Sequence, residues 1–354
     1  MATKLRGKVK YMKKKVYRNL LLSGFGVALL IVYVSLTKSG YTVMVLNTAL
    51  LNAIVAYGLS IMLGMGGQLV FSGIVFMGVG AYVTANLCSG RLGFYTSGTA
   101  AIVLSILVVA LLSLIMGMLF LRLRGAFCTF STIALVTVGY TLYQNYEPAF
   151  GGPKGIPNIK SWTMFGYTLK DYWEWFYVIL AFTLVVAIFV EMIRNSRLGR
   201  SLSSIRDNEI AAQTLGVNIY WVRVIAYIIA GVFAGLSGSL LALHNTFISG
   251  DQFTFQKSAI LVVMAMLGGI NSTVGIFFGA LIVSFLPEVL RGIDQQYLML
   301  IYGIAIVLMM IFMPMGMAGI ISDAFKKRRR KKRIRQKAEM IFRQTAENTL
   351  RKDA

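Results

Sequence analysis

Long apolar stretches separated by short polar breaks set the pattern of the chain. A helix needs about 20 mostly apolar residues to cross the hydrocarbon core of a membrane. The stretches predicted to be helices of this kind are Tyr17–Leu36, Tyr41–Leu63, Leu69–Cys88, Ser97–Leu121, Ala126–Tyr143, Trp173–Met192, Asn218–Leu243, a short pair Ser258–Leu267 and Val274–Val289, and Gln296–Ile320. The pattern therefore predicts an all-α polytopic integral membrane protein with about 8–10 transmembrane helices.

The short pair differs from the other predicted spans. Ser258–Leu267 cannot cross a bilayer alone, and it is followed by Gly268-Gly269-Ile-Asn271-Ser272-Thr273. Backbone can leave the helix at membrane depth only where protein or a water-filled cavity satisfies its polar groups. We therefore predict a broken or re-entrant pair here. The earlier sequence from Gly66-Gly67 to Gly80 has similar glycine spacing, which suggests an internal duplication.

Arg194–Val217 is polar and charged between two apolar stretches, so it must lie outside the bilayer. Its apolar residues at helical spacing are Leu202, Ile205, Ala212 and Leu215. Asp207 suits an N-cap, and Gly216 stands where a left-handed glycine ends a helix. The segment is predicted to be a surface helix with one apolar and one charged face. Such a helix either binds a cytoplasmic partner or simply meets water.

Composition and charge place the two ends of the chain. The 354 residues are 57% hydrophobic, which is too apolar for a soluble domain. Of the 35 Lys and Arg residues, eight lie in residues 1–18 and thirteen in residues 326–352. Basic flanks next to apolar spans are typical of cytoplasmic segments, so both termini are predicted to be cytoplasmic.

The same charges divide the chain into three parts. We expect a basic cytoplasmic tail at 1–16, a transmembrane domain at 17–321 and a second basic cytoplasmic tail at 322–354. The transmembrane domain holds an inner loop at 194–217 and a Gly- and Pro-rich outer loop at 144–172, which either binds a soluble partner or only links two spans. The basic tails suit anionic lipid headgroups. No aromatic-interleaved basic domain accompanies them, so no nucleic-acid partner is predicted.

The residues that would carry out catalysis are missing from the sequence. There is no G-x-x-x-x-G-K-[ST] motif for ATP, no nucleophile–base arrangement and no metal-ligand spacing around the two cysteines or His244. We therefore predict no catalytic residues, no metal site and no enzymatic activity. Of the acidic residues, only Glu288 is placed within the membrane, because Glu174 and Glu191 lie at the two ends of the span Trp173–Met192. This leaves little for ion coupling. A partner is then expected to supply energy.

Several segments together resemble a known family. The sequence EIAAQTLG from Glu209 to Gly216 resembles the EAA-type coupling loop of ABC importer permeases. One residue separates its Glu from the Ala pair, and the motif's hydrophobic-Leu-Pro ending is absent. The segments at 58–87, 122–135, 151–156, 196–218 and 247–291 resemble, in this order, LivM-type permease subunits of branched-chain amino acid ABC importers. The resemblance covers Tyr41–Met313.

The resemblance implies an assembly and a division of labour within it. The chain would pair with a homologous second permease subunit, two cytoplasmic ABC ATPase subunits and an extracellular substrate-binding protein, in the cell membrane of a prokaryote. ATP and Mg would bind to the ATPases, and this chain would hold no cofactor. The residues expected to dock in the ATPase are Arg206, Asp207, Glu209, Ala211, Ala212, Leu215 and Gly216.

The substrate path is expected at the predicted breaks, where uncapped backbone groups can meet the carboxylate and ammonium of an amino acid. The residues concerned are Gly66, Gly67, Gln68, Gly268, Gly269, Asn271, Ser272 and Thr273. Related importers of sugars, nucleosides or urea and short amides stay open as alternatives. A stand-alone channel or facilitator for a small neutral solute, which would need no ATPase, is a further alternative.

Overall fold

The computed structural model describes residues 40–91, 95–123, 125–164, 167–169 and 171–289, together with Tyr297, Leu300, Gly303, Ile304 and Val307. Three predicted features lie outside the described residues: the first span, Tyr17–Leu36, and the two basic tails at 1–16 and 322–354. Of the last predicted span, Gln296–Ile320, only the five single residues named above are described.

The described residues are almost entirely helical, which confirms the predicted fold class at this level. The elements are α2 (Gly40–Ser60), a π-helical turn η1 (Ile61–Met65), α3 (Gly73–Cys88), α4 (Gly98–Phe120), α5 (Ala126–Asn145), α6 (Glu147–Phe150), η2 (Gly152–Lys154), β1 (Thr163–Met164), β2 (Tyr167–Thr168), α7 (Tyr172–Asn195), α8 (Arg197–Asp207), α9 (Glu209–Thr214), α10 (Ile219–Asn245), η3 (Gly250–Phe253), α11 (Phe255–Gly268) and α12 (Thr273–Val289).

Five of the described helices are long and apolar enough to cross a membrane: α2 with η1, α4, α5, α7 and α10. Each matches a predicted span to within a few residues. Three shorter apolar helices, α3, α11 and α12, accompany them. The prediction that a helix starts at Leu69 is wrong, because the chain stays outside regular structure until α3 begins at Gly73. The small antiparallel hairpin of β1 and β2 in the predicted outer loop was not anticipated.

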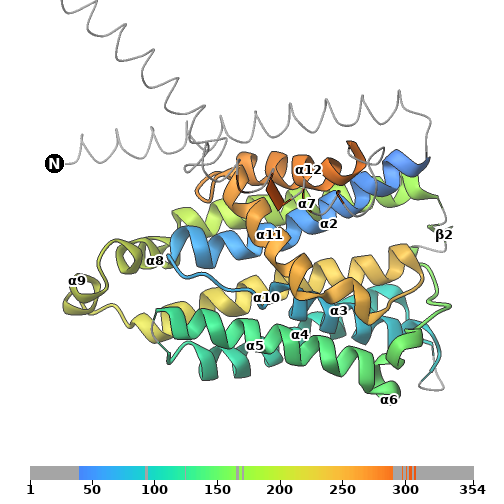
Figure 1. Cartoon of the computed structure of the whole chain (residues 1–354), viewed down its shortest axis with the longest axis horizontal. Helices are drawn as coiled ribbons and strands as arrows, with labels where there is room; N and C mark the ends of the chain where they lie inside the picture. Colours follow the sequence, from blue (N-terminus) through green and yellow to red (C-terminus); the bar gives the residue numbers. More distant parts are fainter. Residues whose placement is uncertain are drawn as a thin grey trace, which may run out of the picture.

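α2 and α10 form the centre of the bundle (Figure 1). The most apolar window of α2 with η1 is 83% buried, and that of α10 is 78% buried, against 28% in both α4 and α5. α10 packs on α2, α3 and α4, while α2 also packs on α7, α11 and α12. α4 and α5 therefore expose apolar residues such as Leu107, Leu111 and Phe130, as helices do that face lipid or another membrane subunit.

Glycines bring α3 and α10 into close contact along the small-residue runs Gly73–Gly80 and Gly231–Gly238. A Cβ added to Gly80 would meet the backbone of Gly235, and one added to Gly238 would meet the backbone of Met77. Helices that touch through glycine backbones gain van der Waals contact, which drives association where lipid removes the hydrophobic effect.

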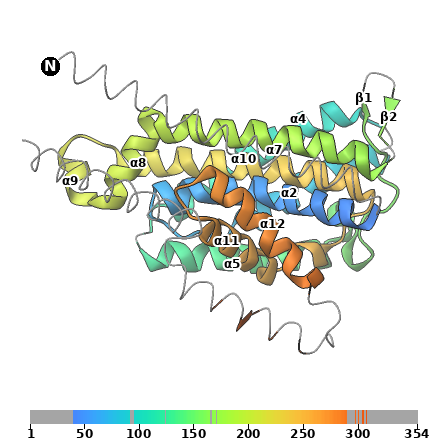
Figure 2. The same cartoon turned by 90° about the horizontal axis from the view of Figure 1, so that it is seen from above.

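The bundle has two distinct ends, which Figures 1 and 2 show in perpendicular views. α8 and α9 project from one end, which we call the α9 end. The hairpin β1–β2 lies at the opposite end, as does α6. At that end the loop after α6 is fastened to the segment after α10, because Ile156 and Ile248 exchange backbone hydrogen bonds of 2.8 and 3.1 Å.

Candidate functional site

Two interruptions of the helices lie at the α9 end. η1 ends immediately before Gly66 and Gly67, and α11 ends at Gly268, followed by Gly269. The second glycine of each pair has a left-handed φ, +65° at Gly67 and +94° at Gly269. L side chains rarely adopt this conformation, so glycine is needed where the helix ends. The predicted break between the short pair of helices is confirmed, and its earlier counterpart has the same backbone feature.

The two breaks contact each other although about 200 residues separate them along the chain. A Cβ added to Gly64 would collide with the carbonyl oxygen and the side chain of Ile270. The Asn271 amide, oriented to suit its neighbours, donates to the Gly64 carbonyl oxygen at 3.3 Å and accepts from Arg206 Nη1 at 3.2 Å. We call Gly64–Gly67 together with Gly268–Thr273 the break junction.

The other predicted substrate-path residues lie in or beside this junction. Ser272 Oγ accepts a hydrogen bond from the Gly275 N–H at 3.1 Å and so caps α12. Thr273 Oγ1 donates to Glu191 Oε2 at 2.7 Å. The side chain of Gln68 is buried, and its Oε1 has no hydrogen-bond partner within the described part of the chain. The structure thus brings the predicted path residues together at one end of the bundle.

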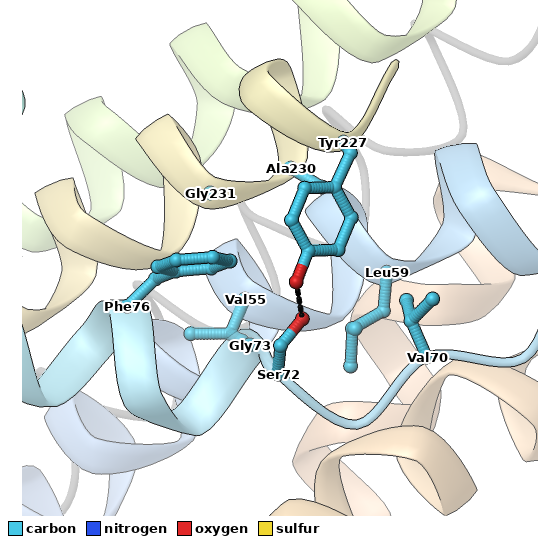
Figure 3. A pocket seen from close by; sticks show the side chains of 9 residues that line it. All are labelled: Val55, Leu59, Val70, Ser72, Gly73, Phe76, Tyr227, Ala230 and Gly231. Atoms are coloured by element: carbon cyan, nitrogen blue, oxygen red, sulfur yellow. Dashed lines mark hydrogen bonds between the residues drawn. The ribbon is translucent and has the colours of Figure 1, made fainter. Parts of the chain in front are cut away.

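A small cavity lies beside the chain that leads into α3 (Figure 3). Its walls include Val55, Leu59, Phe76 and Tyr227, and the Tyr227 hydroxyl donates to Ser72 Oγ at 2.7 Å. The cavity measures about 10 Å³, which is room for one water molecule. In this conformation the cavity is too small for an amino acid side chain.

α8 and α9 are two helices rather than the single surface helix predicted. Ser196 Oγ accepts from the Gly199 N–H at 3.4 Å and starts α8. The prediction that Asp207 is an N-cap is wrong, because Asp207 ends α8 and Asn208 Oδ1 caps α9 by accepting from the Ala211 N–H at 3.0 Å. Gly216 has a left-handed φ of +81° after the last turn, as predicted.

The apolar face of the inner loop also differs from the prediction. Leu202, Ile205 and Ala212 are buried, whereas Leu215 is 82% exposed. Ile210, absent from the predicted set, is 77% exposed. Ile210 stands five residues after Ile205, which is about 140° around a helix and so away from the buried face. Leu215 follows the bend at Asn208, where α9 begins as a separate helix. The sequence signal for Ile210 was a large apolar residue in a polar segment, away from the buried stripe.

The charged residues of the loop divide into inward and outward groups. Arg206 Nη1 donates to the Gly64 carbonyl oxygen at 2.5 Å. Glu209 accepts two hydrogen bonds from Arg223 near the start of α10, at 3.2 and 3.0 Å. Asp207 is exposed, as are Ala211 and Gly216. Two of the three charged residues in the predicted docking set therefore bond within the chain itself.

The comparisons with known proteins agree on one family. Residues 41–313 match the family described as branched-chain amino acid transport system / permease component. The chain is 30% identical over 319 residues to the high-affinity branched-chain amino acid transport system permease protein LivM of Escherichia coli, covering 83% of this chain and 74% of that protein. It is 31% identical over 288 residues to the LivM of Salmonella typhimurium, covering 75% and 67%.

A sugar permease is also related, at lower identity. The ribose import permease protein RbsC of Escherichia coli is 24% identical over 278 residues, covering 75% of this chain and 82% of that protein. No solved structure matches the chain significantly. Since the family match spans most of the chain and includes both breaks and the α8–α9 loop, this protein belongs to the branched-chain amino acid transport system permease family and is a multi-pass, non-enzymatic ABC transporter permease of the prokaryotic cell membrane.

Proposed function

We propose that this permease moves branched-chain amino acids into the cell. The observation that supports this substrate class is the identity of 30 and 31% to two LivM proteins over most of the chain, against 24% to a ribose permease. Sugars, nucleosides and urea or short amides stay as alternatives, because the external binding protein of such an importer largely selects the substrate.

The transporter would contain this chain, a homologous second permease, two cytoplasmic ATPases and an extracellular binding protein. ABC permeases in general act with ATPases and binding proteins. We place the α9 end in the cytoplasm together with both termini, which the basic residues at the two ends of the sequence favour. The opposite end, with α6 and the β1–β2 hairpin, would then face the binding protein.

The surface that would dock in the ATPase is the exposed part of α9 and its flanks. It contains Asp207, Ile210, Ala211, Leu215 and Gly216, all exposed. Two large apolar side chains, exposed by more than three quarters on a helix outside the bundle, suit burial in a groove of a partner protein. Ala212, Glu209 and Arg206 would instead hold this surface in place, because each contacts the rest of the chain.

ATP-driven alternating access would use the break junction as the part that opens. The two breaks touch through backbone atoms at Gly64 and Ile270, so an amino acid can pass there only if they separate. ATP binding would draw the two ATPases together and displace the α9 surface, and the bundle would follow. The chain itself supplies no nucleotide site.

Uptake into vesicles tests the proposal. The vesicles would hold this chain with the proposed second permease, ATPases and binding protein, and internal ATP would be compared with an imposed proton gradient. We expect leucine, isoleucine or valine uptake that requires ATP. Ribose or urea uptake would assign the alternative substrates, while uptake indifferent to ATP would contradict the importer and favour a channel or facilitator.

The docking surface has its own test. Ile210→Asp and Leu215→Asp place a charge on the exposed apolar surface without touching a buried residue. We expect both variants to lose most of the ATPase that co-purifies with the wild-type permease. Lys154→Asp, an exposed residue of η2 at the other end, is the control. Equal ATPase recovery in all three variants would show that α9 is not the docking surface.

A further inference from the structure

The end of α7, the helix that precedes α8, is hydrogen-bonded to the break junction. In the last turns of α7, Arg194 Nη1 donates to Glu191 Oε2 at 2.9 Å and to Thr273 Oγ1 at 3.0 Å. Thr273 Oγ1 in turn donates to the same Glu191 oxygen at 2.7 Å. The Arg194 and Glu191 side chains are only 19% and 15% exposed. These bonds therefore hold the end of α7, directly before α8, against the first residue of α12.

Near the C-terminal end of α8, Arg206 is hydrogen-bonded to the same junction. Its Nη1 donates to the Gly64 carbonyl oxygen at 2.5 Å and reaches the Asn271 amide at 3.2 Å. Its aliphatic part packs on the first break, since a Cβ on Gly67 would lie 2.8 Å from Arg206 Cγ. One guanidinium thus bonds to both breaks, in hydrogen bonds that its charge strengthens.

We propose that Arg206 is the positioning residue that makes the break junction follow α8, and so converts movement of the ATPase-docking loop into opening of the junction. This inference rests on the proposed function. Because the end of α7 is bonded to Thr273 and Arg206 near the end of α8 is bonded to Gly64 and Asn271, α8 cannot shift without moving the junction or breaking these bonds. Bonds to the Gly64 carbonyl and Asn271 also let a single side chain act on both breaks at once.

The position of Arg206 distinguishes this role from docking. Arg206 is partly exposed, but its guanidinium bonds to the junction, whereas the large apolar side chains exposed on the loop are Ile210 and Leu215. Loss of the Arg206 side chain should therefore leave the ATPase bound, but its movement should no longer open the break junction. A residue that merely docks the ATPase would show the opposite behaviour, with binding lost first.

The test is Arg206→Ala in the assembled transporter in vesicles, with Arg197→Ala as the matched control. Arg197 is an exposed arginine of the same helix. We expect Arg206→Ala to retain the ATPase and to hydrolyse ATP, while amino acid uptake per ATP falls about tenfold, the factor that corresponds to losing one hydrogen bond of a charged group. Arg197→Ala should keep the wild-type ratio.

Two further variants separate the contact from the charge. Arg206→Lys keeps the charge but cannot reach both partners with a planar fork, so its uptake per ATP should lie between those of wild type and alanine. Asn271→Ala should lower the ratio alone but add little on top of Arg206→Ala, because both variants break the same contact. Full additivity of the two losses would overturn the inference.

Other outcomes are also decisive. Loss of the ATPase from Arg206→Ala, as expected for Ile210→Asp, would make Arg206 a docking residue. An unchanged ratio of uptake to ATP hydrolysis would show that Arg206 has no such role.

If wild type itself shows no ATP-driven uptake, the proposed function fails. The contact between Arg206 and the break junction can still be tested on the full chain, by labelling Ile270→Cys with a water-soluble maleimide. The native Cys88 and Cys128 are buried and should react little. We expect Ile270→Cys to be labelled faster when combined with Arg206→Ala than when combined with Arg197→Ala, and equal rates would contradict the proposed role of this contact.

Discussion

At the scale of single residues, the pair of Glu209 and Arg223 determines how α9 is held. Glu209 begins α9, and its carboxylate accepts from both terminal nitrogens of Arg223 in α10. The Arg223 side chain is 13% exposed and that of Glu209 is 42% exposed. The planar fork of arginine favours this two-bond geometry. Glu209 therefore orients the docking surface from inside the chain.

We predict that Glu209→Gln lowers the free energy of unfolding by about 1 kcal/mol, a small value because water screens the half-exposed carboxylate. Thermal unfolding in detergent measures it. The charge swap Glu209→Arg with Arg223→Glu should recover most of the stability and most of the ATPase that co-purifies. A swap that recovers stability but not ATPase binding would mean that Glu209 contacts the ATPase directly.

A second residue-scale prediction concerns the hydrogen bond between Tyr227 and Ser72 beside the small cavity. Tyr227→Phe removes the hydrogen-bond donor to Ser72 Oγ. The cavity of about 10 Å³ beside it has room for at most one water that could hydrogen-bond to Ser72 instead. The cost is expected to be about 1 kcal/mol of unfolding free energy, with the KM for uptake unchanged. Tyr177→Phe, at a side chain that is 51% exposed, is the control and should change neither quantity. A large rise in KM for Tyr227→Phe would place the cavity on the substrate path.

At the scale of elements, the sequence predicts that helices exist better than it predicts where they start and bend. Apolar length was sufficient for α4, α5, α7 and α10, since each must satisfy its own backbone in lipid. The start of α3 was missed because Leu69–Ser72 is as apolar as a helix, while the left-handed Gly67 has already ended the preceding helix. Periodicity also could not show the bend at Asn208, which separates α8 from α9 and turns Leu215 outward.

The glycine contact between α3 and α10 carries the element-scale prediction. Gly238→Val would push branched methyl groups against the backbone of Met77, where even a Cβ has no room. We expect a loss of about 1–3 kcal/mol of unfolding free energy, or failure of the chain to accumulate in the membrane. Gly40→Val is the control, because among the described residues an added Cβ there meets only Tyr172 Cδ2, at 3.9 Å. Equal melting temperatures for the two variants would contradict this packing.

At the scale of the whole molecule, the candidate site depends on contacts that no local pattern reveals. The glycine pairs marked both breaks in the sequence, but their meeting at Gly64 and Ile270 follows from how α2, α11 and α12 pack. Arg206 looked like a residue of a charged docking surface, and only the fold shows that its guanidinium turns toward Gly64. The spacing of glycines and charges in the sequence predicted which segments form the candidate site. The packing of the helices determines which side chains point into it.

The orientation of the bundle gives the last prediction. Cys88 and Cys128 are both buried, so the wild-type chain should react little with a membrane-impermeant maleimide. Leu215→Cys at the α9 end should then be labelled only after the cells are opened, whereas Lys154→Cys at the opposite end should be labelled in intact cells. Both positions are exposed, so accessibility within the chain does not limit either reaction. The reverse labelling pattern would show that the bundle has the opposite orientation in the membrane. α9 would then lie outside the cell, where it could not bind a cytoplasmic ATPase.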